Sequence, residues 1–263
     1  MAYSFVCKDP AMSNPFLINP FLIFLISFAA FWIASLIGRW FGDRALKLEE
    51  KHRDDFKFVL GGSLTLLGLI IGFTFSMAVG RYDQRKNLEE EEANAIGTEY
   101  VRVDLLPEAD AANIRSMVTN YLAHRIIKYT SQDKEELRQN EIQTAELQNR
   151  MWSAVSAPAI AQPTPINALV VSGMNDVLNS LGYTQAAWRN RVPVEAWVLM
   201  VMISVFCNLM TGYGGQGRSP YVLLILPIVL SISLFLIADI DSPRMGLIRV
   251  RPLNLDSLAE SLQ

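Results

Sequence analysis

Four long stretches without a charged residue constrain this chain more than any other feature of its sequence. They cover residues 16–38, 58–80, 196–214 and 220–238. A hydrocarbon core about 30 Å thick is crossed by roughly 20 apolar residues in a helix. All four stretches are close to this length, so the sequence predicts four transmembrane helices rather than buried helices of a soluble domain. The last two are joined by a short glycine-containing link and are expected to form a helical hairpin.

The composition agrees with an integral membrane protein and offers little for catalysis. The chain is 51% hydrophobic and 19% charged, with a net charge of −3, which gives no indication of nucleic-acid binding. Its two cysteines, Cys7 and Cys207, suggest neither a disulfide framework nor a metal site. His52 and His124 are the only histidines, and no phosphate loop, nucleophile elbow or HExxH motif is present. We therefore expect no enzyme, no metal and no cofactor.

The four spans also lack every ionisable residue type that marks an ion or proton path. Asp, Glu, Lys, Arg and His are absent from all four stretches. This absence argues against a proton-coupled transporter or an intramembrane enzyme. It does not argue against a channel that is gated by apolar side chains.

The polar segment 81–195 is expected to be a helical extramembrane domain between the second and third spans. The second span should continue through it as one helix until Pro107. A helix with one apolar face from Ile114 to Tyr129 should follow, then a helix over about 134–155 and another over about 166–189. The prolines of segment 157–165 predict a loop.

The predicted fold class is therefore all-α, with four parts along the chain. Residues 1–80 hold spans one and two with a charged connecting loop at 39–57, and residues 81–195 form the helical domain. Residues 196–238 form the hairpin of spans three and four. The tail, 239–263, is expected to end in an amphipathic segment carrying Leu253, Leu255, Leu258 and Leu262.

The charge distribution leaves two orientations open. Four spans place the 81–195 domain and the tail on one side and the 39–57 loop with Arg218 on the other. Basic residues in those two short loops favour a cytoplasmic position for them and an extracytoplasmic domain. The flanks of the domain and the tail are basic as well, so the charges alone do not decide between the two.

The second span has two stripes of residues at four-residue intervals. Small residues recur at Gly68, Gly72, Ser76 and Gly80, a pattern that lets helix backbones approach closely in a membrane. Bulky or apolar residues lie beside them at Thr65, Leu69, Phe73 and Met77. Such a helix is either a member of a helix bundle or a wall of a symmetric pore with an apolar constriction. The pattern alone favours the bundle.

An acidic run, Glu89–Glu92, follows the second span. It could form a vestibule that attracts cations. We favour a solvated helix face instead, in which Arg85 pairs with Glu89 and Lys86 with Glu90 at i,i+4 spacing.

Several of these segments resemble a known family. Gly72-Phe73 followed by Arg81-Tyr82 resembles the end of the pore helix of bestrophins, which also have four spans and acidic residues after the fourth, here Asp239 and Asp241. The segment 92–97, with Arg102–Pro107 and Asp239–Arg249, is closer still to a group of bacterial membrane proteins called bestrophin-like. That closer resemblance covers about residues 58–255.

The resemblance implies a homopentamer in which the second span surrounds a central anion pore. Its apolar constriction falls on Thr65, Leu69 and Phe73, where Thr65 departs from the usual apolar residue. The family keeps its helical domain in the cytoplasm, against the weak charge preference above. Calcium needs six to eight oxygen ligands, and Asp239 and Asp241 with Arg244 nearby do not predict such a site.

The sequence therefore predicts a multi-pass protein of a bacterial inner membrane, in contact with the lipid bilayer. Its leading functional interpretation is a bestrophin-like oligomeric ion channel that conducts inorganic anions, chloride in preference to cations. The alternative is a non-conducting membrane scaffold or sensor whose 81–195 domain binds a partner.

Overall fold

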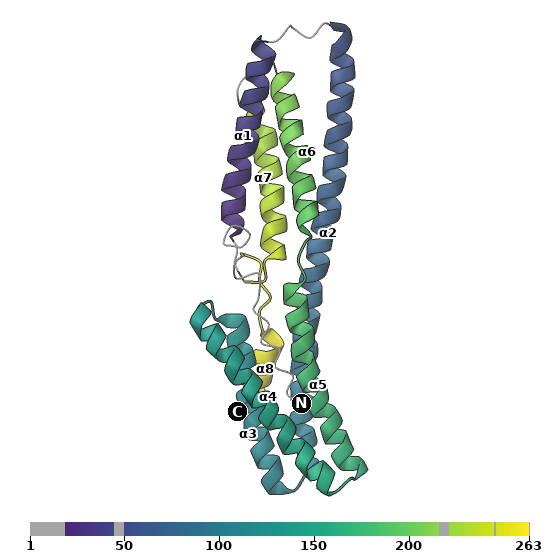
Figure 1. Cartoon of the computed structure of the whole chain (residues 1–263), viewed down its shortest axis with the longest axis vertical. Coiled ribbons are helices and arrows are strands. Elements are labelled where there is room, and N and C mark those ends of the chain that lie inside the picture. The colour runs from purple at the N-terminus through teal and green to yellow at the C-terminus, as the bar shows by residue number, and fades with distance from the viewer. Residues whose placement is uncertain (1–18, 45–49, 216–220, 245, 263) are drawn as a thin grey trace. The chain divides into compact units, whose positions relative to one another are not determined.

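The computed structural model describes residues 19–44, 50–215, 221–244 and 246–262, with only the backbone for residues 50–53. All regular structure in these residues is helical. The elements are α1 (Pro20–Arg44), α2 (Glu50–Arg102), the 3-10 turn η3 (Val103–Leu105), α3 (Glu108–Thr130), α4 (Lys134–Ala161), α5 (Pro165–Arg189), α6 (Val194–Tyr213), α7 (Val222–Asp241) and α8 (Leu253–Ser261). Figure 1 labels the α-helices.

The chain divides into two compact units, and α2 contributes to both. The first, which we call the apolar unit, contains Pro10–Tyr82 and Arg191–Arg249. The second, the polar unit, contains Asp83–Asn190 and Val250–Gln263. The apolar unit thus holds α1, the first part of α2, α6 and α7.

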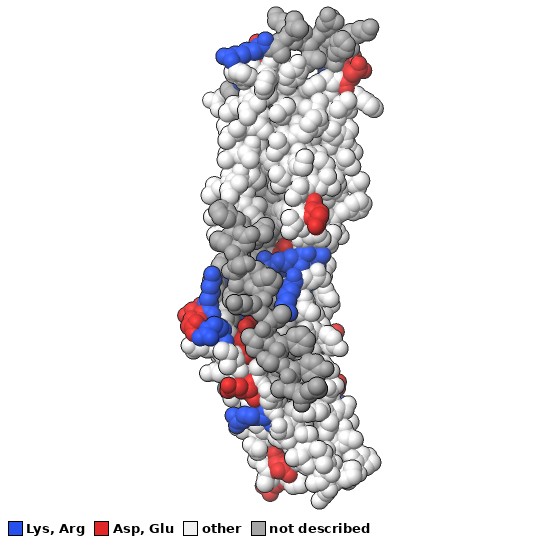
Figure 2. Space-filling view, in the orientation of Figure 1, with Lys and Arg blue, Asp and Glu red and all other residues white. Residues whose placement is uncertain are grey.

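The predicted fold class is confirmed. Four helical segments are long and apolar enough to cross a membrane: Pro20–Arg44, Asp54–Leu105, Pro165–Tyr213 and Val222–Asp241. The third joins α5 to α6, and its apolar part is the span expected at 196–214. On the face drawn in Figure 2, charged side chains are nearly absent from the apolar unit between its ends.

Helices α1, α6 and α7 pack together in the apolar unit, and they run side by side in Figure 1. Phe31 of α1, Met200 and Cys207 of α6 and Leu234 of α7 are buried in one cluster. Helices α1 and α6 meet at two glycines. A Cβ atom at Gly38 would lie 2.0 Å from the carbonyl oxygen of Leu209, and one at Gly212 would lie 2.0 Å from that of Ser35.

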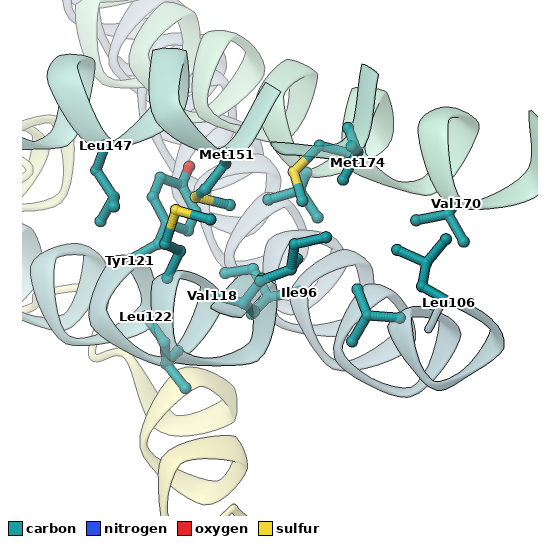
Figure 3. Close-up of a cluster of buried hydrophobic side chains, with 14 of the residues drawn as sticks. Ile96, Leu106, Val118, Tyr121, Leu122, Leu147, Met151, Val170 and Met174 are labelled. Carbon is teal, nitrogen blue, oxygen red and sulfur yellow. The ribbon is translucent and has the colours of Figure 1, made fainter. Parts of the chain in front are cut away.

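The polar unit has its own apolar core, drawn in Figure 3. The face predicted for α3 is largely confirmed, because Ile114, Val118 and Tyr121 are fully buried. They meet side chains from α2, α4, α5 and α8, so each helix of the unit contributes to one core. The labelled members in Figure 3 are Ile96, Leu106, Val118, Tyr121, Leu122, Leu147, Met151, Val170 and Met174.

Two predicted loops are shorter than expected. Segment 157–165 was predicted to be a loop, but α4 continues through Pro158 to Ala161. The amide of Gln162 donates to the carbonyl of Pro158 at 2.9 Å, and the Asn167 side chain donates to the carbonyl of Gln162 at 2.7 Å. An interior proline removes one helix hydrogen bond and crowds the preceding turn, and these bonds hold the turn that follows it.

The charged loop predicted at 39–57 is also largely helical. Helix α1 extends to Arg44 and α2 begins at Glu50. Residues 45–49 lie outside the described residues, as do Cys7, part of the link between spans three and four, and Arg218. The side chain of His52 lies outside them too.

The tail ends in α8, as its leucine pattern predicts. Leu255 is fully buried in the core of the polar unit. A Cβ atom at Gly97 of α2 would lie 3.0 Å from a methyl carbon of Leu258. Leu253, by contrast, is 60% exposed and takes no part in the buried face.

Candidate pore-lining helix and its buried charged face

The predicted constriction residues lie on a face of α2 that the rest of the described chain leaves exposed. Leu69 is 53% exposed and Phe73 is 66% exposed. Thr65 is exposed as well, and its hydroxyl donates to the carbonyl of Gly61 at 3.0 Å, so its only donor is satisfied within the helix. The opposite face carries the contacts with the rest of the apolar unit, through Leu67 and Ala78.

The small-residue stripe lies on this exposed face. A Cβ atom added at Gly68, Gly72 or Gly80 would meet nothing within 4 Å, and Ser76 is exposed. Within the described residues, the stripe therefore packs against no other helix. A packing role between copies of the chain remains a prediction.

The apolar part of α2 is poorly covered compared with the other spans. Only 11% of its most apolar 18-residue window is buried within the chain, whereas 50% of the window in α7 is buried. Both stripes of α2 thus form one broad surface that is left open, among the described residues, to lipid, another protein chain or the lumen of a pore. We call this surface, from Thr65 to Gly80, the open face of α2.

Beyond the apolar stretch, the opposite face of α2 carries charged residues that are buried in the polar unit. Arg85, Glu89, Glu92 and Glu99 are each at most 1% exposed. They alternate at spacings of four and three residues with the apolar residues of the same face, Ile96 and Val103, which are fully buried. Ionised groups are rarely buried without partners, so their contacts define how α2 is held.

Arg85 and Glu89 bind the ends of two other helices of the polar unit. The Arg85 guanidinium donates to the carbonyls of Ala187 at 3.1 Å and Asn190 at 3.0 Å, at the carboxyl end of α5. The Glu89 carboxylate accepts from the amides of Asn254 and Leu255, both at 3.0 Å, at the amino end of α8. Each charge has the sign that its helix end favours.

Glu92 forms a buried ion pair with Arg125 of α3. The Arg125 Nε–H donates to Glu92 Oε1 at 2.5 Å, and its Nη2–H donates to Glu92 Oε2 and to the Thr184 hydroxyl of α5, both at 3.2 Å. Burial alone lowers the pKa of Arg125, but the Glu92 carboxylate more than offsets this and raises it overall. Through these bonds the pair links α2, α3 and α5.

These contacts correct the prediction of a solvated acidic face at Glu89–Glu92. Glu90 and Glu91 are exposed, as predicted, whereas Glu89 and Glu92 are buried. The missed signal was the spacing, since Glu89, Glu92 and Glu99 fall on the same helical face as Ile96 and Val103. The four consecutive glutamates indicated a solvated segment, whereas the spacing of Glu89 and Glu92 along the helix indicated that these two are buried.

The two aspartates after span four bind backbone amides. The Asp239 carboxylate accepts from the amides of Leu247 at 2.7 Å and Ile248 at 2.9 Å. The Asp241 carboxylate accepts from the amide of Val192 at 3.1 and 3.2 Å. Both carboxylates organise the connections at this end of the apolar unit. The described residues contain no group of three or more His, Cys, Asp or Glu side chains that could hold a metal ion.

His124, the histidine with a described side chain, has a structural contact. Its Nδ1 lies 2.6 Å from Oδ1 of Asn140, whose amide donates to the His124 carbonyl at 2.9 Å. These hydrogen bonds connect α3 to α4.

Comparisons with known proteins agree with this geometry. A family model described as the bestrophin-like domain matches residues 28–255. Among solved structures, a bacterial bestrophin homolog from Klebsiella pneumoniae is similar with a TM-score of 0.62 and 15% sequence identity, over 92% of this chain and 95% of that chain. A variant of a homolog from the same organism gives 0.63 and 15% over the same shares. No curated protein matches the chain.

Proposed function

This chain belongs to the bestrophin-like family, and from that premise we propose that it is a homo-oligomeric ion channel of a bacterial inner membrane whose pore is lined by α2. Family membership supports a channel kind of function over an enzymatic one. The pentamer and the chloride pore implied by the family resemblance complete the proposal. We assign the constriction to Thr65, Leu69 and Phe73, and the contacts between copies to Gly68, Gly72, Ser76 and Gly80.

The open face of α2 is the observation that carries this proposal. A helix that only met lipid would have no use for small residues every four positions, since those residues expose its backbone without packing. Against a second helix, the same stripe permits close approach. The adjacent residues Thr65, Leu69 and Phe73 are one helical turn apart, about 6 Å along the axis. In a ring of copies they would form successive collars of the kind that gate by excluding water.

A specific observation favours cations as a second candidate for the permeant ion. The exposed residues of α2 just past the apolar stretch include Asp83, Glu90 and Glu91, with Lys86 as the exposed base. Rings of acidic side chains favour cations in channels. The family resemblance favours chloride as the permeant ion, whereas the acidic residues of α2 favour a cation. The reversal potential in a salt gradient would distinguish the two.

Cysteine cross-linking tests whether α2 lies at the axis of an oligomer. Cys7 and Cys207 are first replaced by serine, and single cysteines are then introduced as Phe73→Cys on α2 and Val229→Cys on α7. Val229 is a matched control because it is 53% exposed in the apolar unit. We expect oxidation to link copies through position 73 and not through position 229. Links through position 229 alone would overturn the arrangement.

Ion flux from liposomes tests conduction. Purified protein should pass chloride, and the sign of the reversal potential in a potassium chloride gradient should identify the preferred ion. A ring that forms but passes neither ion would favour the alternative, a non-conducting scaffold or sensor whose 81–195 domain binds a partner. A monomer in detergent would contradict the channel at an earlier step.

A further inference from the structure

Glu99 differs from the other buried carboxylates on its face of α2. It is fully buried, and neither of its carboxylate oxygens has a hydrogen-bond partner in the described part of the chain. Glu89 accepts from backbone amides and Glu92 from Arg125. Burial of an ionised carboxylate without such donors is costly, whereas a neutral carboxyl group is tolerated far more easily.

The Glu99 carboxyl group lies next to the backbone of α5 at Gly173. A Cβ atom at Gly173 would lie 2.1 Å from Glu99 Oε2 and 2.5 Å from Arg102 Nη1. The space for both side chains therefore exists because residue 173 is glycine. No other residue type fits there without moving α5 away from α2 or displacing both side chains.

The charged groups near Glu99 come from the two helices that meet there. Arg102 follows Glu99 on α2, and its Nη1 lies 4.0 Å from Oδ2 of Asp176 on α5. Desolvation is the largest cause of a raised pKa at Glu99; Arg102 lowers this pKa and Asp176 raises it, and together they leave it at about 8. Arg102 is thus shared between an exposed acid, Asp176, and a buried one, Glu99.

We propose that Glu99 is a proton-operated contact between α2 and α5. In its neutral form it packs against Gly173 and leaves Arg102 beside Asp176. When it loses its proton to solvent, the new carboxylate must draw Arg102 away from Asp176 or admit water between the helices. Either change loosens α2 from α5 around this position.

The contact would act on the proposed pore through α2 itself. Thr98 and Val101 are exposed on the side of α2 away from Glu99, in the adjacent turns. A shift of this part of α2 would therefore move residues of its uncovered side. This last step rests on the proposed channel function, whereas the protonation of Glu99 and its effect on the α2–α5 contact do not.

Infrared difference spectroscopy tests the protonation state directly. The spectrum of the intact protein minus that of Glu99→Gln should show the carbonyl stretch of a protonated carboxylic acid at neutral pH. The band should disappear as the pH rises through about 8. Glu92→Gln is the matched control, because Glu92 is paired with Arg125 and should give no such band. Absence of the band at neutral pH in the Glu99 difference spectrum would overturn the proposal.

The pH dependence of unfolding tests the contact independently. A carboxyl group whose pKa is raised from 4.5 to about 8 in the folded state binds more protons when folded. Stability then falls as pH rises through this interval and levels off above it. Glu99→Gln should remove this fall, so its advantage in apparent Tm should grow between pH 5 and pH 8. Parallel profiles for the two proteins would contradict the proposal.

Flux measurements separate this inference from the channel proposal. If the protein conducts, its flux should change across the same pH interval and Glu99→Gln should lose that change while keeping flux at low pH. A carboxyl band and an altered stability profile without flux at any pH would support the proton-operated contact and reject the channel. Flux with the same pH dependence in both proteins would reject the action of the contact on the pore, and the carboxyl band and the stability profile would still decide the contact itself.

Discussion

Two regions of the apolar unit use glycine in opposite ways. Where α1 crosses α6, the backbone carbonyls of Leu209 and Ser35 occupy the space that a Cβ at Gly38 or Gly212 would need. On the open face of α2, the same test at Gly68 and Gly72 finds no atom within 4 Å. The first pair of glycines has its packing partner within the chain, and the second pair has none among the described residues.

The α1–α6 glycines serve packing within a single chain, whereas the α2 glycines could serve packing only between copies of the chain. Glycine in a helix interior is less favourable than alanine by roughly 0.5–1 kcal/mol. At the α1–α6 crossing, close backbone packing compensates that loss within one protomer. On α2, compensation would have to come from another copy of the chain. Replacing glycine by alanine should therefore destabilise the isolated protomer at the α1–α6 crossing and stabilise it on the open face of α2.

The largest effect is expected at the α1–α6 crossing. Gly212→Ala places a methyl group 2.0 Å from the carbonyl oxygen of Ser35, where only the backbone can move. Overpacking of this kind costs about 1–3 kcal/mol, and occasionally more. Apparent Tm and the yield of folded protein in detergent should both fall. An unchanged Tm would show that the crossing is looser than the structure describes.

A bulky residue on α2 should act on assembly and leave the protomer folded. A Cβ atom at Gly72 would meet no described atom within 4 Å, and Gly72 lies on the open face, so the protomer of Gly72→Leu should keep its secondary structure and Tm. If copies meet along the small stripe, the added side chain separates them and the oligomer should be lost. Mass measured by light scattering in detergent checks this outcome. An oligomer that survives would place the stripe outside the interface.

Much of this contrast could not be predicted from sequence, because glycine spacing does not identify a partner. The stripe on α2 was noticeable for its regular four-residue interval, yet the glycines that pack between spans of the apolar unit include the isolated Gly38 and Gly212. Apolar length located α1, α6 and α7 well, since the membrane imposes that length. Which apolar side of α2 is uncovered depends on the tertiary contacts of Leu67 and Ala78.

In the polar unit, the burial of charged residues was likewise hard to predict from sequence. Periodicity located α3 and its buried face, but Glu92 was assigned to solvent with the rest of the acidic run because charged residues are usually exposed, and Glu99 was given no role. Their burial depends on Arg125, distant in sequence, and on the absence of a side chain at Gly173. A glutamate at a position where periodicity demands an apolar residue was the available signal.

A smaller effect is expected at the proposed constriction. Phe73 is 66% exposed, so Phe73→Ala removes little packing from the protomer and should leave its Tm nearly unchanged. In a ring, the loss of the aromatic side chains would widen an apolar collar and lower the barrier to wetting. Flux from liposomes should rise several-fold. Phe41→Ala on α1, which is 51% exposed in the same unit, is the matched control and should not alter flux.

The smallest effect, and the one that tests the sign of the comparison, is expected for Gly68→Ala. The new methyl group meets no atom of its own chain within 4 Å, and alanine is favoured over glycine in a helix by up to about 1 kcal/mol. The isolated protomer should therefore become slightly more stable, opposite in sign to Gly212→Ala. In the assembled protein the same methyl would enter a close contact between copies, so that gain should shrink or reverse. Apparent Tm measured for dissociated and assembled protein distinguishes the two cases, and an equal gain in both would indicate that Gly68 faces lipid.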